Sequence, residues 1–223
     1  MHLNSALLFS RYAKGYIRED SRILEIGPAG IPSEYQKLAN VPSATWHFID
    51  FSDTRYIDAA TSKLTYTMQD AYRFPVPDNE YDIILSGQVI EHVQKPWLWL
   101  KESKRVVKPR GLIVTINPVS WPYHEAPIDC WRIYPSGIEG LAEEHGLAVE
   151  LCVCESLEAE RLREGKVRGP LIPGRSYTYP ETAAYTRFAL RWNALVGSLP
   201  VVGRRVLVPI EVAFDVVSVL RKN

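Results

Sequence analysis

A short apolar segment that ends at a glycine constrains this sequence most. Residues 23–26 are apolar except for Glu25, and Gly27 follows them directly. A run of this kind is typical of a buried parallel strand, and glycine lets the backbone turn sharply and approach a ligand closely. A second apolar run, residues 46–49, ends in Asp50. A strand, a glycine turn and an acid at the tip of the next strand are typical of nucleotide sites in doubly wound α/β folds, where the acid accepts hydrogen bonds from the ribose.

The glycine pattern alone also fits an ordinary strand-to-helix turn, because the sequence contains neither a G-x-G-x-x-G fingerprint nor a phosphate-binding loop. The segments that follow favour the nucleotide site. They occur in a fixed order over residues 69–71, 74–79, 81–86, 89–93 and 105–114.

This ordered series resembles the class I S-adenosylmethionine-dependent methyltransferases over about residues 20–150. The resemblance implies an α/β fold, a Rossmann-like doubly wound, mostly parallel sheet with helices on both faces. The chain departs from the usual glycine loop in having Pro28 and Ala29 between Gly27 and Gly30. This variant is similar to a subgroup found among enzymes of bacterial polysaccharide and glycolipid assembly.

The resemblance also implies where S-adenosylmethionine binds. Asp50 would hold the ribose, Asp70 would accept the adenine amino group, and Ala71 would donate its backbone N–H to the ring. For Glu25 and Asp70, local capping of backbone amides is the alternative role. The expected cofactor-binding residues are Glu25, Gly27, Pro28, Ala29, Gly30, Asp50, Phe51, Ser52, Asp70, Ala71, Ser86 and Gln88.

Three polar residues follow the strand expected over residues 81–85. Gln88, Glu91 and His92 would share one face of a helix, since residues three and four apart are neighbours there. Related 2′-O-methyltransferases of small RNA and some quinone-biosynthesis O-methyltransferases have Glu-x-x-Glu-His here and hold a divalent metal, whereas this sequence has Gln88 first. We therefore expect either Mg²⁺ or a similar cation held by Glu91, His92 and His124, or a helix start in which His92 only packs beside the cofactor.

A loop over residues 117–134 is rich in proline, aromatic and ionisable residues, and long loops of this kind are usually functional. His124 titrates near neutrality and can deprotonate a hydroxyl, while Glu125 and Asp129 can orient it. We predict His124 as the general base, with Glu91 and His92 as further catalytic residues. The alternative is a proline-stiffened lid with His124 in solvent.

The amino-acid composition disfavours some classes of binding partner. Lys and Arg number 26, and Asp and Glu also number 26, so a broad nucleic-acid-binding surface is disfavoured. The three cysteines form neither a disulfide framework nor a zinc spacing, which fits a reducing cytoplasm. No apolar run is long enough for stable membrane insertion.

The chain is expected to divide into a catalytic domain over residues 1–155 and an addition over residues 156–223. We predict that the addition is a flexible excursion followed by helices packed on the same domain or on a partner subunit, as in a homodimer. The last helix, about residues 209–220, would carry one polar stripe formed by Glu211, Asp215, Ser218 and Lys222. A membrane surface is a third option, which the acids in the stripe disfavour.

The expected activity is O-methylation of a hydroxyl on a sugar or oligosaccharide. Trp121, Tyr123 and Trp131 supply flat faces for sugar rings, and His124 would take the proton. A phenolic or quinol acceptor is the alternative within the same chemistry. A cofactor-binding scaffold that regulates a partner enzyme is the alternative outside it.

Overall fold

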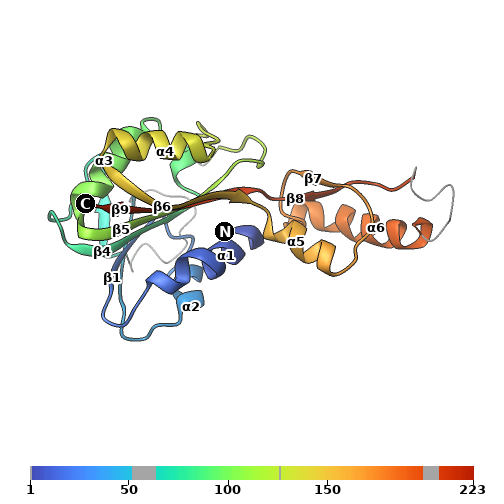
Figure 1. The fold of residues 1–223 in the computed structure, drawn as a ribbon, viewed down its shortest axis with the longest axis horizontal. Coiled ribbons are helices and arrows are strands. Elements are labelled where there is room, and N and C mark those ends of the chain that lie inside the picture. Colours follow the sequence, from blue (N-terminus) through green and yellow to red (C-terminus); the bar gives the residue numbers. More distant parts are fainter. Residues whose placement is uncertain (1, 52–63, 126, 198–205) are drawn as a thin grey trace.

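A seven-stranded sheet forms the body of the protein in the computed structural model, which describes residues 2–51, 64–125, 127–197 and 206–223 (Figure 1). The strand order is β3-β2-β1-β4-β5-β9-β6. Neighbouring strands from β3 to β5 run parallel, whereas β9 is antiparallel to both β5 and β6. The strands are β1 (Arg22–Ile26), β2 (Thr45–Phe51), β3 (Tyr66–Met68), β4 (Tyr81–Gly87), β5 (Val107–Pro118), β6 (Leu147–Glu155) and β9 (Asp215–Lys222).

Helices cover both faces of this sheet (Figure 1). On one face lie α3 (Pro96–Val106) and α4 (Pro135–Glu144), which bury Trp99 and Ile138 in one core. On the other face lie α1 (Leu3–Leu8) and α2 (Glu34–Ala39), which bury Leu8 and Tyr35 in a second core. The doubly wound, Rossmann-like fold is thereby confirmed.

A serine directly before a helical pattern is a sequence signal for a helix N-cap, and the connection from β1 to α2 contains such a serine. Ser33 caps α2, because its hydroxyl accepts a hydrogen bond from the Gln36 amide at 3.0 Å. Asn40 ends the helix in the left-handed conformation with φ of 52°. The N-terminal helical segment is irregular, since a π-helical turn, η1 (Phe9–Ala13), and a 3₁₀ turn, η2 (Lys14–Tyr16), follow α1.

The helix predicted over residues 209–220 is wrong. Those residues form β8 (Ile210–Val212) and β9, and β9 lies inside the main sheet between β5 and β6. Both faces of a central strand are covered, so its apolar residues do not alternate with polar ones. Its buried polar groups find partners instead, as in the 2.7 Å hydrogen bond between the Ser218 and Thr115 hydroxyls.

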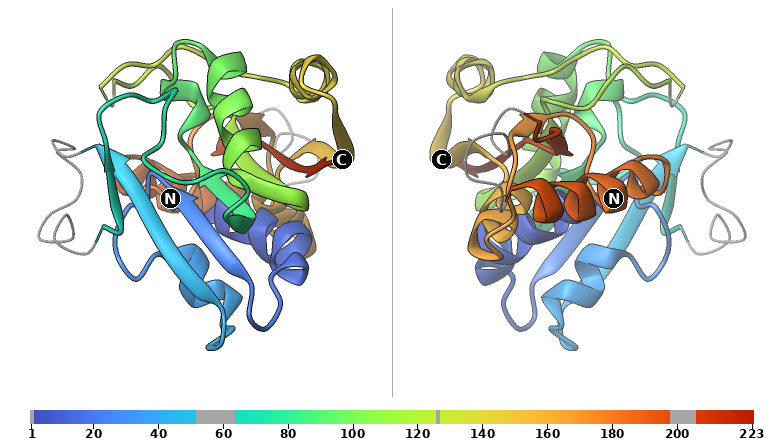
Figure 2. Two further views of the ribbon diagram at one scale, coloured as in Figure 1. Left: turned by 90° about the vertical axis from the view of Figure 1, so that its left-hand side faces the viewer. Right: turned by 90° about the vertical axis from the view of Figure 1, so that its right-hand side faces the viewer.

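A small lobe projects from one end of the sheet, between β6 and β9 in the chain (Figures 1 and 2). It consists of α5 (Leu157–Glu164), β7 (Leu171–Pro173), α6 (Pro180–Val196) and β8, with β7 and β8 paired in parallel. Its own core includes Leu162, Ala189 and Ile210. The expected excursion after residue 155 is therefore ordered in large part. No helix in the described part of the chain is long and apolar enough to cross a membrane.

Candidate functional site

The turn after β1 places the backbone against the segment that follows β4. Gly27 adopts a positive φ of 67°, and its amide donates to the Ile49 carbonyl of β2 at 3.0 Å. A Cβ atom at this position would lie 2.6 Å from Cγ2 of Val89. A side chain is therefore excluded by both backbone conformation and space. A Cβ atom at Gly30 would meet nothing within 4 Å, so the loop is open there.

Buried polar groups surround this turn. Glu25, Ser86 and Glu91 are 3%, 2% and 1% exposed. The Ser86 hydroxyl and both carboxylate oxygens of Glu91 have no hydrogen-bond partner among the described residues. Buried polar atoms are normally satisfied, so a bound group is the expected partner.

The same carboxyls carry shifted pKa values. Burial raises the pKa of Glu25 to about 8, although a 2.5 Å hydrogen bond from the Ser33 hydroxyl opposes the shift. Burial likewise raises the pKa of Glu91 to about 8. The Tyr35 hydroxyl has a raised pKa because of its burial and then because of the charges of Glu25, Asp215 and Glu91. These residues therefore enclose one buried polar region that is suited to a cationic ligand.

The other predicted cofactor residues lie at the tips of β2 and β3. Asp50 is 9% exposed, and its Oδ1 accepts from the Phe51 amide at 2.7 Å. Asp70 is exposed, and its Oδ1 accepts from the Tyr72 amide at 2.8 Å, as in a local turn. Ser52 lies outside the described residues. Pro28 is buried, Ala29 exposed and Ala71 half-buried.

The expectation that Gln88, Glu91 and His92 share one helical face is wrong. The segment forms only a 3₁₀ turn, η4 (Ile90–His92), and Gln88 precedes it with a φ of 60°. The Gln88 amide instead donates to the Ser5 hydroxyl at 3.0 Å and to Oδ1 of Asp215 at 3.1 Å. Asp215 was not foreseen as a neighbour of this segment.

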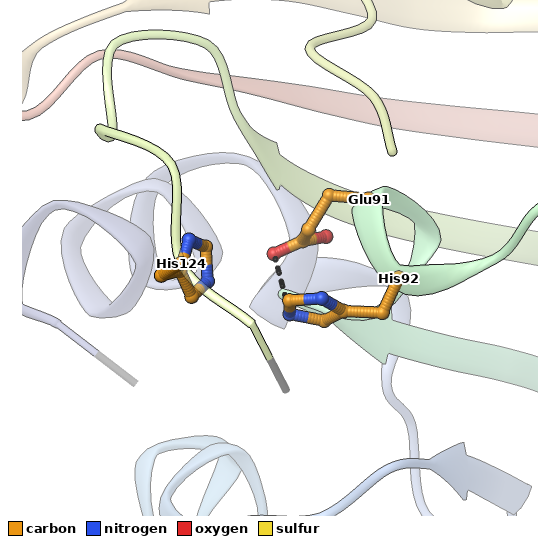
Figure 3. A group of neighbouring side chains, drawn as sticks. All are labelled: Glu91, His92 and His124. Carbon is orange, nitrogen blue, oxygen red and sulfur yellow. Dashed lines mark ion pairs between the residues drawn. The ribbon is translucent and has the colours of Figure 1, made fainter. Parts of the chain in front are cut away.

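Glu91, His92 and His124 nevertheless come together, and their side chains point toward one another (Figure 3). One possible ligand atom from each lies within 4.8 Å of the others. The His92 and His124 rings meet edge to face with centroids 5.0 Å apart. His92 Nδ1 lies 2.5 Å from the Ile128 carbonyl, an arrangement that makes Nδ1 the donor, and His92 Nε2 lies 3.7 Å from Oε1 of Glu91 (Figure 3). Burial lowers the pKa of His92.

A carboxylate and an arginine hold His124. Oδ2 of Asp129 accepts from the His124 amide at 2.8 Å and lies 3.3 Å from Nδ1 of its ring. Arg132 binds both carboxylate oxygens of Asp129, at 2.5 and 2.7 Å. Burial alone would raise the pKa of Asp129, but these hydrogen bonds hold it at about 2. The carboxylate is thus ionised and can keep the proton of His124 on Nδ1. Glu125 instead accepts from the Tyr123 hydroxyl at 2.7 Å.

Aromatic rings line the approach to His124. Trp121 stacks on His2 with ring centroids 4.7 Å apart, meets Tyr179 edge-on at 4.9 Å, and lies 6.5 Å from His124. Tyr123, by contrast, is 71% exposed. His2 and Tyr179 were missed because each lies far from the loop in sequence, and no local pattern marks either of them.

Comparison with known proteins agrees with this geometry. Residues 24–115 match the model of a methyltransferase domain family. A methyltransferase of uncharacterised function from Schizosaccharomyces pombe is 29% identical over 119 residues, which cover 47% of this chain and 42% of that protein. One from Mycobacterium avium is 29% identical over 141 residues, covering 61% and 53%. The chain spans about half the length of these curated relatives.

The fold is also shared with solved structures. Phosphoethanolamine N-methyltransferase 2 of Haemonchus contortus, in complex with S-adenosyl-L-methionine, has a TM-score of 0.56 at 14% identity. The likeness covers 98% of this chain and 52% of that one. Residues 24–115 thus match a methyltransferase domain family, and the chain shares the fold of S-adenosylmethionine-dependent methyltransferases.

Proposed function

We propose that the chain is an S-adenosylmethionine-dependent O-methyltransferase with His124 as its general base. The observation that carries the proposal is the Asp129–His124 pair, which lies in the loop after β5, beside the buried polar region at the glycine turn. Asp129 lies 3.3 Å from Nδ1, so a proton held there leaves Nε2 as the acceptor nitrogen. Arg132 balances the charge of Asp129.

S-adenosylmethionine supplies an activated methyl group on a sulfonium sulfur. The acceptor oxygen forms a bond to the methyl carbon as the carbon–sulfur bond breaks, and S-adenosylhomocysteine leaves. His124 takes the hydroxyl proton on Nε2. Glu25, Ser86 and Glu91 fit the cofactor because they are buried beside the glycine turn and two of them have no hydrogen-bond partner in the described chain.

A hydroxyl on a sugar or oligosaccharide is the acceptor that we propose. A sugar hydroxyl is almost fully protonated at neutral pH, so it needs a base such as the Asp129–His124 pair. The Trp121 ring, already stacked on His2, offers a flat face to a pyranose ring. A phenol or quinol would use the same aromatic surface and would need less help from a base, so it is the second candidate.

A panel of acceptors tests this choice. We expect methyl transfer to some members of a panel of mono- and disaccharides, detected with labelled methyl donor and identified by mass spectrometry as a methyl ether. Turnover of catechols without turnover of any sugar would show that the acceptor is a phenol and not a sugar. The methyl-transfer reaction itself would still hold. Tight cofactor binding without transfer to any acceptor pool would favour a regulatory scaffold.

The cluster of Glu91, His92 and His124 has a second candidate role as a divalent metal site. Glu91 supports it, because its buried carboxylate accepts no hydrogen bond from the described residues, lies 3.7 Å from Nε2 of His92, and would be neutralised by a cation. For this role, a chelator is expected to abolish methyl transfer and Mg²⁺ to restore it. Unchanged turnover in excess chelator would leave His124 as a base that needs no metal.

Asp50 is proposed to bind the ribose of the cofactor. Asp50→Ala is expected to weaken binding of both S-adenosylmethionine and S-adenosylhomocysteine by roughly 10-fold or more, since it removes a charged acceptor worth about 1.5–3 kcal/mol. Titration calorimetry measures both affinities. Normal affinity in this variant, with the exposed Asp70→Ala as a comparison, would contradict the assignment.

A further inference from the structure

One face of α6 presents large apolar side chains to solvent. Phe188 and Leu195 are 56% and 70% exposed, and Trp192 stacks on Phe188 with centroids 6.2 Å apart. These side chains belong to a single stripe, because positions three and four apart on a helix are neighbours. The stripe borders a shallow hollow of about 410 Å³ and consists of Ala184, Arg187, Phe188, Arg191, Trp192 and Leu195.

The core of the lobe does not use this stripe. The opposite face of α6 packs on that core, where Ala189 is buried and Val196 is 7% exposed. Asn193 on that face donates to the carbonyls of Arg168 and Val208, both at 2.9 Å. Trp192 reaches the rest of the lobe through a 2.8 Å hydrogen bond from Nε1 to the Val206 carbonyl, but the apolar side chains of the stripe remain exposed at the surface. Exposed apolar groups gathered on one face mark an interaction surface.

The charges around the stripe favour an anionic partner. Its two charged members are Arg187 and Arg191, both exposed. The one acid of α6, Glu181, lies in the first turn and pairs with Arg175 at 3.1 Å. Residues 156–214 contain nine Lys or Arg against five Asp or Glu, although the whole chain is balanced. A second copy of the chain fits poorly, because a symmetric contact would bring these arginines together without an acid in the stripe to pair with them.

We propose that α6 lays this stripe on the surface of an anionic lipid bilayer. Tryptophan, phenylalanine and leucine beside arginine are the side chains that interfacial helices use, with rings and alkyl groups at the level of the headgroups. The contact is peripheral. It requires no membrane-spanning element, and none of the described helices can span a bilayer.

The position of α6 links this surface to the candidate site. Tyr179, which precedes the helix, contacts Trp121 beside His124. At a rise of 1.5 Å per residue, Phe188 lies about 14 Å along the axis from Tyr179. Docking would thus hold the loop of the candidate site close to the headgroups. The inference that this position helps catalysis rests on the proposed methyl transfer. The inference that α6 binds the bilayer does not depend on that reaction.

Vesicle sedimentation with the full chain tests the proposal without any measure of activity. We expect binding to vesicles that contain phosphatidylglycerol, little binding to phosphatidylcholine alone, and release by added salt. Arg187→Gln combined with Arg191→Gln should lower the partition coefficient about 30-fold, since each basic residue near such a surface contributes about 1 kcal/mol. Lys37→Gln combined with Lys101→Gln makes the same charge change on exposed faces of α2 and α3 and should leave binding unchanged.

Phe188→Ser tests the apolar half of the stripe and should weaken binding about 5- to 10-fold while the circular dichroism spectrum stays that of the wild type. Equal binding to neutral vesicles, absence of binding to anionic ones, or equal loss in the lysine control would overturn the proposal. A dimer that Phe188→Ser converts to monomer in sedimentation velocity would assign the stripe to a second copy instead.

Discussion

Replacing His124 with alanine is expected to lower kcat for methyl transfer by about 10²–10⁴-fold, the range for loss of a general base. Affinity for the cofactor should change little, because the buried polar groups at the glycine turn do not include His124. The measurement combines steady-state kinetics with titration calorimetry on the same preparation. Tyr123→Phe is the matched control, since it changes a neighbouring residue that is 71% exposed and should retain near-normal kcat.

A second variant separates a base from a structural residue. Asp129→Asn should give an intermediate loss, because the ring stays in place while the ionised group that fixes its tautomer is gone. A His124→Ala enzyme with near-normal kcat would reduce His124 to a residue of the lid.

The strands β1, β2 and β4 could be predicted because each contains a short, mostly apolar run that ends near turn residues or an acid. Ser33 is an informative case, since a serine before a helical pattern predicted a cap that the structure contains. A helix cap can be predicted from the sequence because the backbone amide that the capping side chain binds lies only a few residues away.

The last strand could not be predicted for the opposite reason. Glu211, Asp215, Ser218 and Lys222 occur at helical spacing, yet the spacing is fortuitous. Asp215 is fully buried and is satisfied by partners more than a hundred residues away, such as the Asn4 amide at 2.6 Å. A polar residue in a central strand looks like a helix surface unless its distant partner is known.

In the candidate site, too, contacts within one segment could be predicted from the sequence, whereas contacts between distant segments could not. His124 and Asp129 lie within one loop, so their pairing could be proposed from the sequence, and the structure brings them to 3.3 Å. Gln88 was assigned to the cofactor, but its amide reaches Ser5 and Asp215, which come from opposite ends of the chain. Tyr179 follows the lobe strand β7 and reaches Trp121 only through the fold.

A second large effect is expected at Glu25, where pH should change the free energy of unfolding of the protein without cofactor. Its pKa in the folded chain is raised to about 8 from an ordinary 4.5 because of burial. The folded state therefore holds the proton more tightly than the unfolded state does. Stability is complete below about pH 4.5, falls as pH rises toward 8, and levels off above it.

Glu25→Gln mimics the protonated carboxyl and should remove this dependence. We expect wild type and variant to have similar free energies of unfolding near pH 4.5, and the variant to be more stable by on the order of 5 kcal/mol at pH 9. Urea denaturation across this range measures the difference, with Glu34→Gln on the exposed face of α2 as the control. A difference independent of pH would show that Glu25 is ionised throughout. Because the cationic cofactor favours the ionised carboxylate, saturating S-adenosylmethionine should reduce the decline in wild type and have less effect in Glu25→Gln.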